Sequence, residues 1–441
     1  IKIFITMKKF LNLTILAVMV AACSSEEPMP VTDNSAQQQG SIKVTVEEAI
    51  KIANQAAEAF DAKSARGVSR RASSAAMVDV LGAKNGRSGG IDTLLYMVNY
   101  DNKQGYAIVS ASRACETLLG IVDEGEFNAL EAAENPSYSY YLANAQNYVA
   151  STLGDGISIG GEPITPEYTE VRYDVKDIIP TKLNIRWGPL YPEGDLCPYD
   201  YAGCDAVAVA QILSYEKLPA SIPLTYEGRT EDLLVLDWDD ICRHTISTST
   251  LAYNDIHMHI AKCYATQDAH VELGKLCREI NARCGVQYVT YGKTTTVDGM
   301  AAALLKSLLP SKQTTNYSLV GSDYETLFES LRSGIGYISG SDITGRHAWV
   351  VDGAKHVGYT CTKYWKQVNV ITGEQLVTYE DHTTRYFHFN WGYSGQDNGY
   401  FKAGVFDPSD GDHEIIWDNP IKHAPSRNNY GTDVKCMIIS D

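Results

Sequence analysis

The pattern of apolar and polar positions divides the chain into a mixed N-terminal stretch, a helical stretch and a strand-rich end. Residues 44–60 place apolar side chains at helical spacing behind a Thr45–Glu48 capping box. Residues 93–112 hold two apolar runs around Asp-Asn-Lys-Gln-Gly, which predicts a β-hairpin. Residues 117–127 predict a further strand and turn, and residues 135–151 predict a helix. The first unit is therefore a small α+β domain.

The second half of the chain changes from helices to strands. Residues 205–218 are apolar nearly all round and are followed by Pro219, which predicts a central buried helix. Residues 270–285, 294–309 and 322–334 predict three more helices. After Gly334 the pattern is that of strands, joined by turns at Asp352-Gly353, Thr372-Gly373 and Asn398-Gly399. Helices followed by an antiparallel sheet predict an α+β domain with two lobes and a site in the cleft between them.

Polar and Gly/Pro-rich stretches set the expected boundaries of these units. Residues 153–170 include GDGISIGGEPITPEY and predict a linker, so we place the first unit at 42–152 and the second at 171–441. Residues 24–41 are polar and predict a flexible tether. Residues 7–23 begin with a basic pair, continue with a short apolar run and end in Val-Ala-Ala-Cys, which predicts a secretory signal. This ending resembles a bacterial lipobox, so we expect Cys23 to be lipidated and the protein to be an outer-membrane lipoprotein. It would face the periplasm or the cell surface, or be released after maturation.

Composition narrows the function classes. The formal net charge of −17 argues against nucleic acid as a partner, because phosphate binding requires clustered Lys and Arg. Nine cysteines remain besides Cys23, and an odd number leaves at least one thiol unpaired. The chain has no Cys-x-x-Cys pair and its histidines are scattered, so no metal site and no cofactor are expected.

Three polar residues lie where a cysteine nucleophile would need them. Cys204 precedes the buried helix, where the free backbone N–H groups and the helix dipole favour a thiolate. His347 opens a strand 143 residues later, and Asn390 ends another strand 43 residues after that. In papain-like enzymes a cysteine attacks the carbonyl, a histidine shuttles the proton and an asparagine orients the imidazole. Each residue alone fits ordinary packing, but the order of cysteine on a helix and histidine and asparagine on strands points to catalysis.

The blocks around these residues resemble a known family. GCDAVAVAQILSYEKLP, GRHAWVVDGA and FHFNWGYSGQDNGYF are similar to the signature blocks of the streptopain family of papain-like cysteine peptidases, and RCGVQYVTYG resembles a further family element. The first unit is similar to the family's inhibitory prosegment. The resemblance implies a papain-like fold and a zymogen that is matured by cleavage between residues 150 and 185. It also implies that Cys204 is the nucleophile, His347 the general base and acid, and Asn390 the orienting residue, with Trp391 shielding the His–Asn pair.

Three positions depart from the family pattern. Pro189 stands where the family has a Gln that donates to the oxyanion, and the loss of one such donor typically costs about 10²–10³ in rate. Asp205 replaces a valine, and a carboxylate about 6 Å from the thiolate repels it by roughly 1.4 kcal/mol at an effective dielectric of about 40, or about one pKa unit. Asp205 is equally explained as a helix-start residue facing solvent. Arg346 replaces a glycine and is expected either to neutralise Asp205 across the cleft or to crowd the substrate channel.

Three functions follow from these observations. The first is a secreted, lipid-anchored cysteine endopeptidase that acts on proteins or peptides, attaches to the membrane through its N-terminal lipid and is inhibited by its own prosegment. The second is an impaired relative that retains the fold as a protein- or peptide-binding module, which Pro189 supports. The third is another papain-like reaction, such as cleavage of cell-wall peptide or acyl transfer. Labelling of Cys204 by a thiol-directed probe would separate the first two.

Overall fold

The computed structural model describes residues 43–62, 70–73, 78–84, 91–153, 168–228, 232–245, 265–290, 292–319, 324–342, 345–368, 375–406 and 434–441. The expected signal, Cys23, the tether and the Thr372-Gly373 turn lie outside these described residues. We call residues 43–153 the N-terminal unit and residues 168–441 the C-terminal unit. Among the described residues, no helix is long and apolar enough to cross a membrane.

The N-terminal unit confirms the predicted capped helix and hairpin. The Thr45 side chain accepts a hydrogen bond from the Glu48 N–H at 3.3 Å, and the Glu48 carboxylate accepts one from the Thr45 N–H at 2.8 Å. This capping box starts a helix that packs on strands of the unit. The elements of the unit are α2 (Val46–Asp61), β1 (Val78–Lys84), β2 (Ile91–Asn99), β3 (Tyr106–Ser110), β4 (Leu118–Val122), α3 (Ala129–Glu134) and α4 (Pro136–Leu153).

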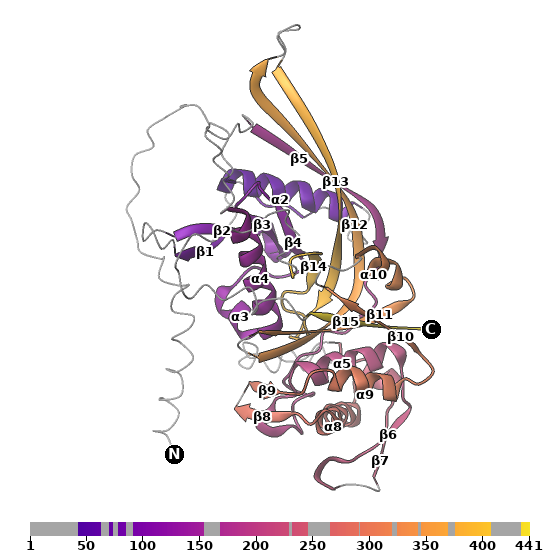
Figure 1. Ribbon diagram of the computed structural model, residues 1–441. Helices are drawn as coiled ribbons and strands as arrows, with labels where there is room; N and C mark the ends of the chain where they lie inside the picture. The colour runs from indigo at the N-terminus through magenta and orange to yellow at the C-terminus, as the bar shows by residue number, and fades with distance from the viewer. Residues whose placement is uncertain are drawn as a thin grey trace, which may run out of the picture.

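A helical lobe forms the first half of the C-terminal unit and lies below the sheet in Figure 1. Its central helix, α5 (Cys204–Glu216), is buried from Asp205 to Ser214 because its residues are apolar on every side, as predicted. It ends at Lys217, which adopts a left-handed conformation, two residues before Pro219. The other elements of this lobe are β6 (Ser221–Pro223), β7 (Leu233–Val235), α6 (Trp238–Ile241), α8 (Gln267–Cys284), β8 (Gln287–Thr290), β9 (Lys293–Thr295) and α9 (Met300–Leu308).

One antiparallel sheet runs through both units of the protein. Its strand order is β1-β2-β3-β4-β14-β13-β12-β11-β15-β10, with β5 paired to the outer half of β12. The bridge between the units is the pairing of β4 with β14, in which Gly399 lies opposite Val122. The C-terminal elements are β5 (Tyr168–Ile179), β10 (Gln313–Ser318), α10 (Tyr324–Ser330), β11 (Gly334–Asp342), β12 (Gly345–Val368), β13 (Gln375–Asn390), β14 (Gly399–Lys402) and β15 (Lys435–Ser440). A helical lobe and an antiparallel sheet confirm the predicted α+β class.

The two units also share an aromatic core. Tyr138 and Tyr141 of α4 pack against Phe401 of β14, with ring centroids 6.1 and 4.6 Å apart. Trp391 and Trp349 of the C-terminal unit complete the cluster, with centroids 5.4 Å apart. The N-terminal unit is therefore packed into the C-terminal unit as part of one hydrophobic core.

The predicted turn at Asp352-Gly353 is wrong. The chain continues through it as β12, and the pairing with β13 shifts by one residue between Val351 and Gly353. The Asp352 carboxylate accepts hydrogen bonds from the Lys182 and Leu183 N–H groups at 3.2 and 2.9 Å. A Cβ on Gly353 would lie 3.1 Å from the backbone of residues 179–181, so the Asp-Gly pair here marks a bulge with a close strand crossing.

Candidate active site

Cys204 is the first residue of α5 and lies against the start of β12. Gly203 precedes it with φ +82°, a conformation that favours glycine. The Cys204 thiol donates to the backbone carbonyl of Arg346 at 3.9 Å, so it lies beside the segment that carries His347. Burial and, as the next cause, the neighbouring Asp205 carboxylate together raise the pKa of the Cys204 thiol to about 12. The direction predicted for Asp205 is confirmed, but burial is the larger cause.

His347 lies opposite Gly340 in the β11–β12 pair and is covered by the N-terminal unit. The Tyr140 ring of α4 packs on the imidazole with centroids 5.3 Å apart and planes inclined by 32°. A Cβ on Gly340 would come within 2.9 Å of the Tyr140 ring, so this glycine provides the space that the ring occupies. The Ser137 hydroxyl also donates to the Ala348 carbonyl at 3.2 Å. The start of α4 is therefore docked directly on the histidine strand.

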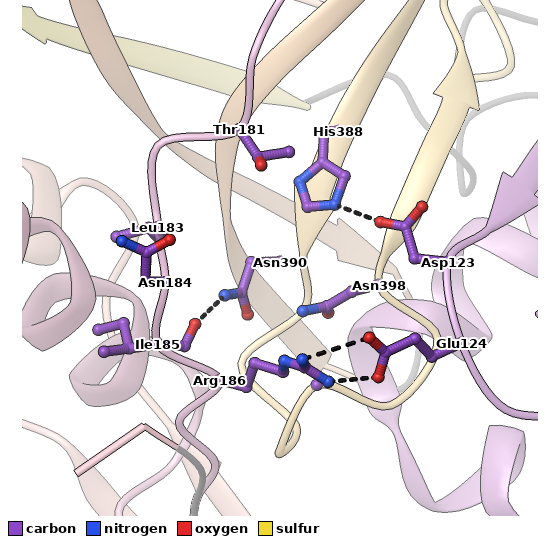
Figure 2. Close-up of a pocket in the computed structure, with 11 residues that line it drawn as sticks. Asp123, Glu124, Thr181, Leu183, Asn184, Ile185, Arg186, His388, Asn390 and Asn398 are labelled. Atoms are coloured by element: carbon purple, nitrogen blue, oxygen red, sulfur yellow. Dashed lines mark hydrogen bonds and ion pairs between the residues drawn. The ribbon is translucent and has the colours of Figure 1, made fainter. Parts of the chain in front are cut away.

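Asn390 ends β13 as predicted, but its amide is bonded away from His347. Its Nδ2 donates to the Ile185 carbonyl at 3.1 Å (Figure 2). Its Oδ1 accepts from the Gly392 N–H at 3.1 Å. Trp391 follows in the aromatic core, where its indole N–H donates to the Asp397 carbonyl at 2.8 Å. In this structure Cys204 thus lies close to the His347 segment, whereas the Asn390 amide holds the loop segment around Ile185.

The three departures occupy defined positions around Cys204. Asp205 does not face solvent but is buried, and its carboxylate lies 3.6 Å from the guanidinium of Arg346. This ion pair confirms the expectation that Arg346 neutralises Asp205. Pro189 lies beside the chain segment that leads into Cys204, since its carbonyl accepts a hydrogen bond from the Ala202 N–H at 2.7 Å. Proline offers no donor at this position.

Charged pairs link the two units next to Asn390. His388 lies between Asp352 and Asp123, with its Nδ1 2.5 Å and its Nε2 3.0 Å from the two carboxylates. Burial alone would lower the pKa of His388, but the two carboxylates raise it to about 10. Arg186 pairs with Glu124 at 2.5 Å on the same side (Figure 2). Because Asp123 and Glu124 belong to the N-terminal unit, these pairs help to hold that unit in place.

Sequence reasoning missed the residues of the N-terminal unit that contact the site. Tyr140 is one of several tyrosines in its helix, and no sequence signal separates it from Tyr138 or Tyr141. Asp397 accepts a hydrogen bond from the Tyr106 hydroxyl at 2.7 Å, and burial raises its pKa to about 6. In the described residues, no group of His, Cys, Asp and Glu is arranged to hold a metal ion.

Comparisons with known proteins identify the families that the two units match. Residues 186–401 match the Peptidase C10 family, and residues 41–149 match the Spi protease inhibitor. The thiol protease/hemagglutinin PrtT of Porphyromonas gingivalis is 24% identical over 343 residues, which cover 72% of this chain and 34% of that protein. The chain therefore spans about a third of the length of that relative.

One solved structure shows the same fold. A prointerpain A fragment from Prevotella intermedia is 16% identical, with a TM-score of 0.50 that covers 82% of this chain and 98% of the fragment. The active interpain A of the same organism is 17% identical, covers 60% of this chain and 95% of its own, and has a TM-score of 0.34. The likeness to the fragment confirms the papain-like α+β fold. The peptidase part of the chain, residues 186–401, therefore falls in the Peptidase C10 family, the streptopain family of cysteine peptidases, and a Spi-type inhibitor domain at residues 41–149 precedes it.

Proposed function

We propose that the protein is a cysteine endopeptidase made as a self-inhibited zymogen, with Cys204, His347 and Asn390 as its catalytic residues. The observation that carries the proposal is the docking of Tyr140 on His347, beside the Cys204 thiol. An inhibitor domain placed on a cysteine–histidine pair is expected of a peptidase precursor, and nothing in the packing of a binding module requires it. Proteins or peptides are the proposed substrates.

The mechanism requires removal of the N-terminal unit. With α4 in place, the Cys204 thiol has a pKa of about 12, so it is protonated at neutral pH, and the thiol is a poor nucleophile. Departure of α4 would admit water to the site, and solvation would lower the thiol pKa. His347 would then take the Cys204 proton as the sulfur attacks the scissile carbonyl, and return it to the leaving amine. Water would hydrolyse the resulting thioester with His347 as the base.

Asn390 and Trp391 act on His347 in this proposal. The Asn390 amide would exchange its bond to the Ile185 carbonyl for one to the imidazole, which fixes the ring for proton transfer. Trp391 would cover that hydrogen bond from water. The backbone N–H of Cys204 would donate to the oxyanion. Because Pro189 supplies no second donor, we expect a rate about 10²–10³ below that of an enzyme with both donors.

The N-terminal segment supports an exported, membrane-attached precursor. We propose that residues 7–23 direct export and that Cys23 receives the lipid, so that the tether holds the peptidase at the outer membrane. Phase separation in detergent tests this directly. The intact protein from bacterial membranes should enter the detergent phase, whereas a Cys23→Ala variant should stay in the aqueous phase. Equal partition of the two proteins would contradict lipidation.

The second candidate is an impaired relative that binds proteins without cleaving them. Pro189 favours it, since the site lacks one oxyanion donor. The two functions separate when the purified full-length chain is incubated with casein and reductant, beside its Cys204→Ala variant. A peptidase should lose its prosegment, cleave casein and react at Cys204 with an epoxide probe of the E-64 type. An intact prosegment together with an unlabelled Cys204 would contradict the proposal of a peptidase and favour the protein-binding function.

A further inference from the structure

A chain of charged and polar side chains runs from the buried Asp205, next to Cys204, out to the half-exposed Lys435. The Tyr337 hydroxyl donates to the Asp205 carboxylate. One guanidinium nitrogen of Arg346 donates to the Tyr337 oxygen at 2.9 Å and lies 3.6 Å from Asp205. The other nitrogen donates to Asp298, which also accepts from Lys435 at 2.9 Å. Four elements of the peptidase part, α5, β11, β12 and β15, and the loop before α9 thus meet in one network.

This network balances its own charge. Asp205 and Asp298 contribute two carboxylates, and Arg346 and Lys435 contribute two cations. The side chains of Asp205 and Arg346 are each 7% exposed, so each would be a nearly buried single charge without the other. Removal of one partner from a buried pair is costly because it leaves an uncompensated charge. The two departures from the family pattern therefore depend on each other.

The network joins the direct neighbours of both proposed catalytic residues. Asp205 follows Cys204 on α5, and Arg346 precedes His347 on β12. Adjacent residues of a strand point to opposite faces, so Arg346 can be held below the sheet while His347 faces the site above. The Cys204 thiol already donates to the Arg346 carbonyl. A displacement of the Arg346 side chain would therefore shift the backbone that carries His347.

We propose that Asp205 and Arg346 are a coupled positioning pair, which sets the register of His347 against Cys204 and offsets the charge that Asp205 places beside the sulfur. This inference rests on the proposed function, because it takes Cys204 and His347 as the reacting pair. Tyr337 orients the pair through its hydroxyl, and Asp298 holds the second nitrogen of Arg346. The charged groups that act on the Cys204 thiol are Asp205 and Arg346. Around that pair lie Cys284 on α8, Tyr337 on β11, Asp298 before α9 and, beyond Asp298, Lys435 on β15. Tyr140 on α4 packs on the neighbouring His347.

The test has two readouts, a double-mutant cycle on the full-length chain and the kinetics of the matured enzyme. The first readout is the pH dependence of Cys204 alkylation by iodoacetamide, measured on its peptide by mass spectrometry, which needs no peptidase activity. Arg346→Gln should slow alkylation at pH 8 about tenfold, and Asp205→Asn should speed it by a similar factor. The double variant should return to within about twofold of the parent. Lys363→Gln is the control, because Lys363 pairs with Glu380 at 2.6 Å on the outer β12–β13 hairpin.

The second readout separates position from charge. Arg346→Lys retains the positive charge but loses the planar fork that reaches two partners. Casein hydrolysis by the matured Arg346→Lys enzyme should show kcat about tenfold lower with KM unchanged, while its alkylation profile stays near that of the parent. This variant also serves if Arg346→Gln does not fold.

Additive effects of the two substitutions on alkylation, or single variants that match the Lys363→Gln control, would overturn the coupling. An unchanged kcat in Arg346→Lys would overturn the positioning role. If the parent cleaves no casein but the alkylation cycle still shows coupling, the proposed function fails while the charge-offsetting half of the inference stands.

Discussion

Tyr140 is the residue whose removal should release the latent site. Its side chain is 2% exposed, and its ring packs on His347, Trp349 and Phe406 with centroids 5.3, 6.1 and 5.9 Å apart. Truncation of a buried aromatic side chain to alanine typically costs about 3–5 kcal/mol. The start of α4 makes these contacts only while it is docked, so Tyr140→Ala should raise the undocked population about 100- to 4,000-fold, at 1.4 kcal/mol for each factor of ten.

The assay is the rate at which iodoacetamide alkylates Cys204 in the uncleaved chain at pH 7.5. Tyr140→Phe retains the ring and should react at the parental rate, so it is the matched control. Cys277 is 0% exposed in α8 and reports global unfolding, because it reacts only when the helical lobe opens. Tyr140→Ala should accelerate labelling of Cys204 without labelling of Cys277. Equal Cys204 rates in the alanine and phenylalanine variants would refute the assignment of Tyr140 as the block.

Three further predictions concern Gly340, Asp397 and Pro189. Gly340→Ala places a methyl group 2.9 Å from the Tyr140 ring, so the rate of Cys204 labelling should rise at least about tenfold in the parent. The same substitution should hardly change the rate in the Tyr140→Ala background, and similar increases in both backgrounds would contradict the steric argument. Burial raises the pKa of Asp397 to about 6. The protonated Asp397 carboxyl therefore contributes up to about 3 kcal/mol to the free energy of unfolding below about pH 4, and this contribution is lost as the pH rises through 6. Between pH 4 and 7 the Tm of the Cys204→Ala chain should therefore fall relative to that of Cys204→Ala/Asp397→Asn, and parallel Tm curves would count against this linkage. Pro189→Gln should raise kcat on casein about 10²-fold through a second oxyanion donor, and an unchanged kcat would show that position 189 does not face the oxyanion.

Local patterns predicted the helices well because their signals lie within a few residues of one another. The Thr45–Glu48 capping box, the largely apolar α5 and its end before Pro219 all appear as expected. The same holds for α8, which ends at Gly285 with a left-handed φ of +65°. These features depend on the spacing of apolar residues and on the backbone preferences of single residues, both of which can be read from the local sequence.

Long-range pairing could not be predicted in this way. Asp352-Gly353 has the composition of a turn, but Asp352 bonds to His388 and to backbone N–H groups about 170 residues earlier in the chain. The covering of His347 by Tyr140 joins residues more than 200 positions apart. The blocks around Cys204, His347 and Asn390 located the candidate site, whereas the bond from Asn390 to Ile185 depends on how the two units are docked.

The aromatic core shared by the two units gives the N-terminal unit a part in folding as well as in inhibition. Tyr138 and Tyr141 fill the space against Trp391 and Phe401, and β4 completes the hydrogen bonds of β14. A peptidase chain synthesised without the N-terminal unit would have to fold with the edge of β14 and the rings of Trp391 and Phe401 exposed to water. We therefore expect residues 43–153 to act as a template that must be present while the peptidase part folds. Once the template is gone, the mature enzyme would persist because its unfolding is slow, so its working lifetime would be set by a rate and not by an equilibrium.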